Sequence, residues 1–451
     1  MNRTKIFFSL LTLIFVGYMN NLYAQENLQQ QTDEYINAYV KMNLFNGSVL
    51  IAKGSEILAS NAYGLASYEF CIPNVAETKF RIGSLTKGFT AVAIMKLSED
   101  HKLSLDDKLS RFIPDYPRGD EITVKNLLTH TSGIPNHTEF SDYNRDRRVY
   151  HYDVTETIST VKNKKLDFNP GEKSAYSNSN YILLGYIIEK VSNMSYEKYI
   201  NENIFQPLKM FNSGFEHPDN IIKNFSGGYI LQNNELHKSH YRDMSNAQAS
   251  GALYSTVGDL YLWDRALYSD KIIGEKSRYL LFNEYKNNFT YGWGIVNVYK
   301  HKMIALAGET DGFRANISRF PDDDLCIIVL SNFEHTPLNR INRELIAMVF
   351  GEKYAIPEIQ KTIALPHEIM QSYEGAYEVS PGFNFNIIVE DKRCFCQPTG
   401  QSKLELFAIA ENEFFIPEAD AIIHFTKKDS SKTEKLILKQ GGGEVAAFKI
   451  N

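Results

Sequence analysis

Apolar and polar residues divide this chain into β-prone ends and a helical middle. Gly47–Ala52 and Ile57–Leu65 are β-prone runs separated by a short polar segment, which predicts a hairpin of two strands. From Ser84 to about Asn201 the apolar residues recur mostly at helical spacing. This spacing predicts helices over Thr86–Ser98 and Asn180–Val191.

Strand patterns return late in this region. Gly312–Phe320 and Leu325–Ser331 flank the turn sequence Pro321-Asp322-Asp323-Asp324, which predicts a second hairpin. Early strands, a helical middle and late strands favour an antiparallel sheet built from both ends, with helices inserted between its strands and packed on it. The expected fold class is therefore α+β.

A second β-rich region follows a boundary over residues 356–366, which we interpret as a linker. Short β-prone runs separated by glycine or polar turns follow it, at Asn384–Val389, Cys394–Gln397, Glu413–Ile416, Ala421–Thr426, Lys435–Leu438 and Ala446–Ile450. Regular short strands predict a small all-β barrel or sandwich. We therefore expect one domain over residues 25–355 and a C-terminal β domain over residues 367–451.

The first 24 residues have the pattern of a signal peptide. Arg3 and Lys5 precede an apolar run over Ile6–Val16, and Leu22-Tyr23-Ala24 forms a cleavage site before Gln25. The alternative is an uncleaved anchor, but the run is shorter than the ~20 residues that span a bilayer. We expect cleavage and export to a periplasm or the medium, with no membrane span left afterwards.

Composition narrows the function classes. Of the 451 residues, 43% are hydrophobic and 23% are charged, as in ordinary globular proteins. The net charge of -6 is mild, and the sequence contains no run of basic residues that could bind along a phosphate backbone. Both observations argue against a nucleic-acid partner. Four scattered cysteines are too few for a disulfide framework. The composition leaves the oligomeric state open.

A Ser-x-x-Lys tetrad provides the first candidate chemistry. On a helix the two side chains share a face, and a lysine within reach of a hydroxyl can remove its proton and create a nucleophile. The tetrad occurs at Ser84/Lys87, Ser159/Lys162 and Ser195/Lys198, and an isolated match is most often a surface serine. Only Ser84 follows a glycine and precedes a strongly apolar helix, so we place it at a buried helix start.

Tyr176-Ser177-Asn178 provides the second element. It follows the turn sequence Pro170-Gly171 and precedes the apolar helix, so its side chains could converge on a cleft. A phenol beside an ammonium group can relay protons, and an amide can orient both a lysine and a substrate carbonyl. The alternative for Tyr176 is an ordinary core aromatic.

In this order, the two motifs resemble those of the serine β-lactamase and penicillin-binding protein superfamily. The resemblance is to its class C-like branch, with related esterases and peptidases, and it covers roughly residues 30 to 350. The tail is similar to a small β domain often appended to these enzymes. Further matching segments are Leu127–Pro135, Gly251–Leu260 and Tyr291–Gly294.

The resemblance implies a role for each site residue. Ser84 would be the acylated nucleophile, Lys87 its general base, and Tyr176 the proton shuttle to the leaving group. Asn178 would position the substrate, a small molecule or peptide. The N–H of Ser84 and one near Glu309 would stabilise the oxyanion. No metal or organic cofactor is implied.

His130 invites a different interpretation, as the base of a Ser-His-Asp triad. Lys87 already supplies a base, so we expect His130 to be a structural, hydrogen-bonding histidine in the turn that packs against the Ser84 helix.

The chain departs from the superfamily's third motif, which is Lys or His, any residue, then Gly. The corresponding residues are Leu306-Ala307-Gly308, so the glycine that lets the strand approach a substrate is present but the cation is missing. We therefore expect weaker binding of anionic penicillins and a preference for neutral esters or amides. Arg314 and Lys302 are the candidates to replace the charge.

Two functions follow from these observations. The first is an exported serine hydrolase that forms an acyl-enzyme with an ester, amide or peptide, as an esterase, a D-amino-acid peptidase or carboxypeptidase, or a β-lactamase-like enzyme. The second is a catalytically weak, penicillin-binding-like recognition protein, which only Leu306 favours.

Overall fold

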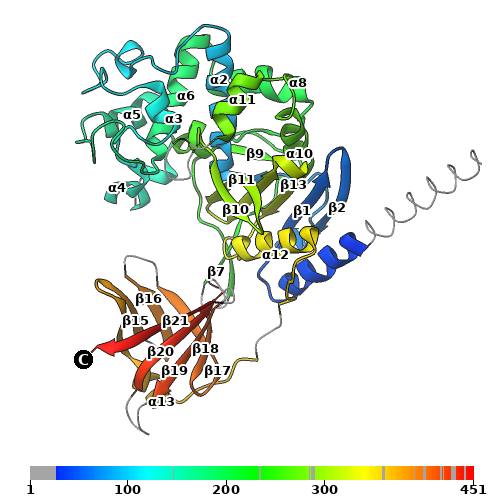
Figure 1. Cartoon of the computed structure of the whole chain (residues 1–451), viewed down its shortest axis with the longest axis vertical. Helices are drawn as coiled ribbons and strands as arrows, with labels where there is room; N and C mark the ends of the chain where they lie inside the picture. The colour runs from blue at the N-terminus through cyan, green and yellow to red at the C-terminus, as the bar shows by residue number, and fades with distance from the viewer. Residues whose placement is uncertain are drawn as a thin grey trace, which may run out of the picture. The chain divides into compact units, whose positions relative to one another are not determined.

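A computed structural model shows the chain as two compact units that divide between Ala355 and Ile356 (Figure 1). It describes residues 27–145, 147–232, 235–283, 285, 290–357, 361–390, 392–399, 403–416, 419, 421–427, 433–440 and 443–450. The predicted signal peptide, residues 1–24, lies outside these residues.

The first unit is built on a six-stranded antiparallel sheet in the order β10-β11-β12-β13-β1-β2. Its strands are β1 Gly47–Lys53, β2 Glu56–Tyr63, β10 Gly294–Val298, β11 His301–Thr310, β12 Phe313–Phe320 and β13 Leu325–Ser331. The first strand pairs with the last, Gly47 opposite Ser331 and Lys53 opposite Leu325. The expected sheet, assembled from both ends of the unit, is confirmed.

Both faces of this sheet are buried at β1 and β13, and these two neighbouring strands are largely apolar. In β1, Val49 and Ile51 point into one hydrophobic cluster, while Leu50 and Ala52 point into another. The first cluster contains the helix over residues 27–41 and α12 Leu338–Phe350. The second contains the inserted helices. Because successive strand residues face opposite sides, a continuous apolar run is needed to fill both clusters.

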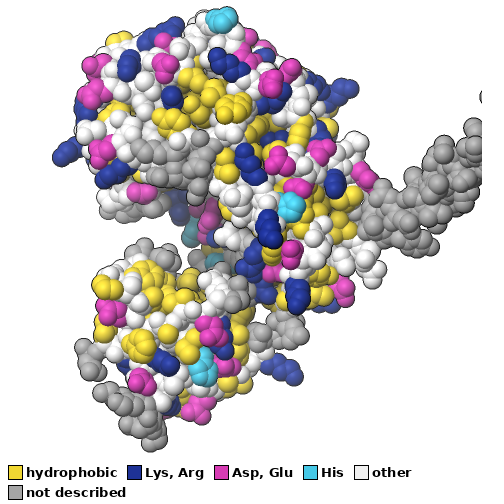
Figure 2. Space-filling model, viewed as in Figure 1, with side chains coloured by type: hydrophobic (Ala, Val, Ile, Leu, Met, Phe, Trp, Pro, Cys, Tyr) yellow, Lys and Arg dark blue, Asp and Glu magenta, His cyan; other side chains and the backbone are white. Residues whose placement is uncertain are grey.

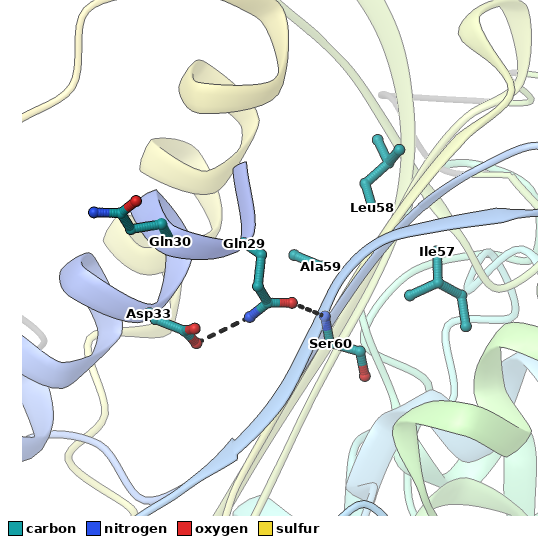
Figure 3. A pocket seen from close by; sticks show the side chains of 7 residues that line it. All are labelled: Gln29, Gln30, Asp33, Ile57, Leu58, Ala59 and Ser60. Carbon is teal, nitrogen blue, oxygen red and sulfur yellow. Dashed lines mark hydrogen bonds between the residues drawn. The ribbon is translucent and has the colours of Figure 1, made fainter. Parts of the chain in front are cut away.

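The helix over residues 27–41 also covers the outer edge of β2. Gln29 Nε2 donates to Asp33 Oδ1 at 3.0 Å, and Gln29 Oε1 accepts from Ser60 N at 2.8 Å (Figure 3). A paired or covered edge cannot recruit a strand from another chain. A hollow of about 530 Å³ opens beside these contacts.

The segment between β2 and β10 contains the helices that carry the candidate motifs. Its α-helices are α2 Thr86–Glu99, α3 Val124–Leu128, α4 Ser141–Arg145, α5 Val154–Lys162, α6 Asn178–Ser192, α7 Tyr196–Ile200, α8 Gln206–Leu208, α9 Gln248–Gly251, α10 Val257–Ala266 and α11 Glu275–Phe282. Short 3-10 helices include η1 Gly83–Leu85, η3 His137–Glu139, η4 Arg147–Val149 and η6 Met244–Asn246. Small strands are β3 Leu65–Ser67, β4 Ile72–Pro73, β5 Phe80–Arg81, β6 Gly214–Phe215, β7 Tyr229–Gln232, β8 Glu235–Lys238 and β9 Leu253–Ser255.

The second unit is a closed β-barrel in which each strand pairs with its sequence neighbour and β21 returns to β14. Its strands are β14 Gly375–Ser380, β15 Phe383–Glu390, β16 Arg393–Pro398, β17 Leu404–Ala410, β18 Glu413–Ile416, β19 Ala421–Lys427, β20 Thr433–Gln440 and β21 Gly443–Ile450. The preceding helix, α13 His367–Tyr373, inserts Tyr373, which stacks on Phe425 with ring centres 4.3 Å apart. Of the two architectures expected, a barrel or a sandwich, the barrel is present.

The predicted α+β class and both helices are confirmed, with α6 starting two residues earlier than expected. Among the strands of the main sheet and the barrel, the hydrophobic pattern missed β10, β11, β14 and β17, and β11 was expected only from the resemblance. All four cysteines are free thiols, and Cys71 is the exposed one.

Figure 2 shows cationic and anionic side chains interspersed on the described part of the visible face. Within the described residues, no helix is long and apolar enough to cross a bilayer.

Candidate active site

Ser84 lies where a tight 3-10 turn, η1, runs directly into the buried helix α2. The turn requires glycine at position 83, where φ is +49°. A Cβ at Gly83 would lie 2.8 Å from the backbone N of Glu309, so β11 approaches the turn closely. Ser84 is therefore held at a helix start, against the strand predicted to line the cleft.

The Ser84 hydroxyl has two partners that can move a proton. Lys87 Nζ lies 3.0 Å from Ser84 Oγ, one helical turn further on. Tyr176 OH lies 2.7 Å from the same oxygen, on a segment 92 residues away in sequence. The fold thus brings the two motifs together around one nucleophilic oxygen.

Lys87 is buried and sits among acceptors. Besides Ser84, its Nζ donates to Asn178 Oδ1 at 2.8 Å and to Ser250 O at 2.7 Å. Burial, the main influence, lowers the pKa of Lys87 below its usual value of 10.5, while Tyr176 acts in the opposite direction. Asn178 Oδ1 and Ser250 O can only accept, so the lone pair of the neutral amine is left facing the Ser84 hydroxyl.

Hydrogen bonds to Asn136 and Thr138 fix the side chain of Asn178. Asn178 begins α6, and its Nδ2 donates to Asn136 Oδ1 at 3.2 Å and to Thr138 Oγ1 at 3.3 Å. Asn136 Oδ1 also accepts from the Asn178 backbone N at 3.0 Å. These contacts direct the amide oxygen toward Lys87 and toward Tyr176 OH, 3.3 Å away.

His130 contacts the site through Tyr176 and its neighbour. Its Nδ1 accepts a hydrogen bond from the Ser177 backbone N at 3.2 Å, and its ring packs 4.8 Å from the Tyr176 ring. Burial, reinforced by the charge of Lys87, lowers the pKa of His130 to about 3. A neutral imidazole held this way supports the loop that carries Tyr176.

Gly308 and Glu309 bring β11 against the nucleophile. A Cβ at Gly308 would lie 2.0 Å from Ile82 O and 2.9 Å from Ser84 N, so only glycine fits. The Glu309 N–H on this strand and the Ser84 N–H are the candidate oxyanion donors.

The position of the missing cation is buried. Leu306 is 7% exposed and belongs to the core beneath α2, where its Cδ1 would lie 2.7 Å from a Cβ on Gly88. Neither expected replacement fills the gap: Arg314 pairs with Glu309 at 3.2 Å, and Lys302 donates to Phe282 O at 3.2 Å. No charge therefore reaches the cleft from position 306.

A polar cleft of about 270 Å³ opens beside Ser84, and we call it the Ser84 cleft. It is lined by Gly83, Ser84, Thr138, Tyr143, Asn178, Arg242, Asn246, Ala247, Ser250, Gly251, Glu309 and Thr310. Sequence reasoning missed Ser250 and Arg242: a backbone carbonyl carries no sequence signal, and Arg242 is a single arginine in an irregular loop. The larger hollow in Figure 3 contains no nucleophile paired with a base among its lining residues.

The other two tetrads have ordinary structural roles. Ser195 caps α7, accepting from Lys198 N at 3.3 Å, and exposed Ser159 donates to Thr155 O at 2.8 Å within α5. In the described part of the chain, no cluster of His, Cys, Asp or Glu could hold a metal ion.

Comparisons with known proteins agree with this geometry. A family model described as Beta-lactamase matches residues 32–349. Penicillin-binding protein 4* of Bacillus subtilis (strain 168) is 29% identical over 89% of this chain and 94% of its own length. A putative penicillin-binding protein of the same organism, PbpX, is 30% identical over 71% of this chain and 79% of its own length.

A solved structure extends the similarity into the second unit. The octameric penicillin-binding protein homologue from Pyrococcus abyssi superposes with a TM-score of 0.66 at 26% identity, covering 92% of this chain and 99% of that one. The resemblance inferred from the sequence is therefore confirmed.

Proposed function

The chain belongs to the beta-lactamase family, and from this premise we propose that it is a serine hydrolase that cleaves an ester, amide or peptide bond through a Ser84 acyl-enzyme. The observation that supports this most strongly is the pair of contacts on Ser84 Oγ, from Lys87 Nζ at 3.0 Å and from Tyr176 OH at 2.7 Å.

Acylation begins with transfer of the Ser84 proton to Lys87. The Ser84 oxygen bonds to the substrate carbonyl carbon, and the resulting oxyanion accepts from the Ser84 and Glu309 N–H groups. Tyr176 then donates its proton to the leaving oxygen or nitrogen as that bond breaks. It recovers a proton from Lys87, with which it shares the hydrogen-bond partners Ser84 Oγ and Asn178 Oδ1.

Deacylation repeats the sequence with water as the nucleophile. A base removes a proton from water, the water oxygen adds to the acyl carbon, and the Ser84–acyl bond breaks with return of a proton to Ser84. Lys87 and Tyr176, which both contact Ser84 Oγ, are the groups that can exchange these protons.

Covalent labelling tests this proposal. Intact-protein mass spectrometry should show one adduct after exposure to a fluorophosphonate, and none in Ser84→Ala. A fluorescent penicillin, offered in parallel, reports whether an anionic β-lactam also acylates the site. Failure of both probes would contradict the hydrolase and favour the recognition protein, which Leu306 makes the second candidate.

Export belongs to the same proposal. It is supported by the pattern of the first 24 residues, with Arg3 and Lys5 before the apolar run and Leu22-Tyr23-Ala24 at its end. N-terminal sequencing of protein from the periplasm or medium of expressing cells should begin at Gln25. Recovery of the full-length chain from the cytoplasm alone would contradict it.

A further inference from the structure

Ser84 separates two environments. Tyr176, which is 42% exposed, contacts Ser84 Oγ but is not among the described residues that line the Ser84 cleft. In the proposed function Tyr176 protonates the leaving group, so the leaving group lies on the Tyr176 side. The Ser84 cleft, which also contains Glu309 of the oxyanion strand, is then the space for the acyl part of the substrate.

This cleft contains a cationic side chain, Arg242, that neighbouring residues hold in place. Arg242 Nε pairs with Asp311 Oδ2, and its Nη1 donates to Tyr143 OH at 2.8 Å. Asp311 is held from its other oxygen by Arg148 Nη1 at 3.2 Å. Side-chain exposure is 16% for Arg242 and 9% for Asp311, so the arrangement is largely removed from solvent.

The charges around the cleft do not cancel. Two arginines share one carboxylate, Asp311, which leaves a net charge of about +1 on this trio at ordinary pH. The other charged residue lining the cleft, Glu309, pairs with Arg314 at 3.2 Å. Within the described residues Arg242 Nη2 has no hydrogen-bond partner, so it can donate to a ligand.

We propose that Arg242 is a specificity-determining residue that selects substrates whose acyl part carries a carboxylate. A guanidinium already oriented by Asp311 and Tyr143 binds a carboxylate with little loss of side-chain freedom. Arg242 lines the Ser84 cleft, so this selection acts on the acyl part of the substrate, and Leu306 supplies no second charge. The inference rests on the proposed function.

Two esters that differ only in acyl charge test it: 4-nitrophenyl hydrogen adipate and its methyl ester. We expect wild-type kcat/KM to favour the carboxylate by at least about tenfold, as for a hydrogen bond to a charged group. Arg242→Gln should bring the ratio of kcat/KM for the carboxylate to kcat/KM for the methyl ester close to one. Arg242→Lys should restore part of it.

The preference separates a binding role from a structural one, because loss of structure would slow both esters equally. Lys302→Gln is the matched control: it removes one positive charge from β11 outside the cleft, and the preference should persist. Equal preference in wild type and Arg242→Gln overturns the inference. Labelling of Ser84 by the fluorophosphonate, together with no acylation of Ser84 by either ester in a separate reaction, also overturns it.

The two proposals fail in different ways. Hydrolysis of both esters at Ser84 without charge preference overturns the inference and leaves the hydrolase intact. Absence of any Ser84 adduct, with the fluorophosphonate as with the esters, overturns the proposed function and the inference together.

Discussion

At the scale of single residues, the site is organised around a lysine amine whose hydrogen-bond partners are neutral oxygens. Lys87 contacts Ser84 Oγ, Asn178 Oδ1 and Ser250 O, and burial lowers its pKa. A lysine with a lowered pKa is neutral over more of the working range and can act as a base. The reactivity of Ser84 thus depends on the burial of its neighbour.

Replacing this lysine tests that dependence. Lys87→Ala should reduce kcat/KM by about 10²–10⁴-fold, the usual contribution of a general base, with the fold retained in thermal unfolding. Lys96→Ala, in the last turn of the same helix, is the control and should turn over normally. Near-normal turnover in Lys87→Ala would mean that the base is assigned wrongly.

The sequence singled out Ser84 by the glycine before it and the apolar helix after it, and the resemblance gave the expected roles of Lys87, Tyr176 and Asn178, which the fold brings together. Arg242 was out of reach, since its significance lies in Asp311 and Tyr143, which only the fold brings beside it.

At the scale of elements, the proposed catalysis depends on how closely strand β11 approaches turn η1. Both contacting positions are glycine, and a Cβ at either Gly83 or Gly308 would overlap the opposing backbone. The positions of the candidate oxyanion donors, the N–H groups of Ser84 and Glu309, depend on this approach. A backbone contact of this kind leaves no room for adjustment by side chains.

Gly308→Ala should therefore move β11 away from the nucleophile. We expect acylation of Ser84 to slow by about 10²–10³-fold, the usual effect of losing one oxyanion donor. Stopped-flow release of 4-nitrophenol measures this. Gly294→Ala on neighbouring β10, where a Cβ would meet only Ala305 O at 3.7 Å, should react at the wild-type rate. Equal rates in the two variants would contradict the role of the close approach.

Elements with continuous or alternating apolar runs could be predicted, and those whose pattern is interrupted could not. β1 and β13 are buried on both faces, and their runs are unbroken. β11 ends in Ala307-Gly308-Glu309-Thr310, where closeness to η1 takes precedence over strand-forming side chains.

At the scale of the whole molecule, the two units have separate hydrophobic cores. The barrel core is centred on Tyr373, Tyr377 and Phe425, apart from the two clusters that cover the sheet of the first unit. Each unit therefore contains the apolar contacts that it needs to fold.

A chain that ends at Ala355 should consequently fold and retain Ser84 labelling by a fluorophosphonate at a rate within about twofold of the full chain, since each unit has its own hydrophobic core. Labelling rates and circular dichroism measure this. Loss of labelling in a folded truncated chain would show that the barrel takes part in the reaction.

Acid sensitivity is a second property of the whole fold. Burial lowers the pKa of His130 to about 3 and of His137 to about 4, from an ordinary value of 6.5. Between pH 6.5 and the lowered pKa of each histidine, the unfolded chain binds a proton at that histidine that the folded protein does not bind. Stability is therefore complete above pH 6.5 and falls as the pH drops, by about 1.4 kcal/mol per pH unit for each histidine.

Urea denaturation at pH 7 and pH 5 tests this sign. His137→Asn should lose less stability between the two pH values than the wild type. The exposed His151→Asn should behave like the wild type. An identical pH dependence in His137→Asn would contradict the account.

The central claim is that Ser84, among three Ser-x-x-Lys serines, is the residue acylated. Tandem mass spectrometry of protein quenched during turnover of a 4-nitrophenyl ester tests it most directly. We predict the acyl group on the peptide that contains Ser84, and its loss in Ser84→Ala. An acyl group on Ser159 or Ser195, or one that persists in Ser84→Ala, would contradict the claim.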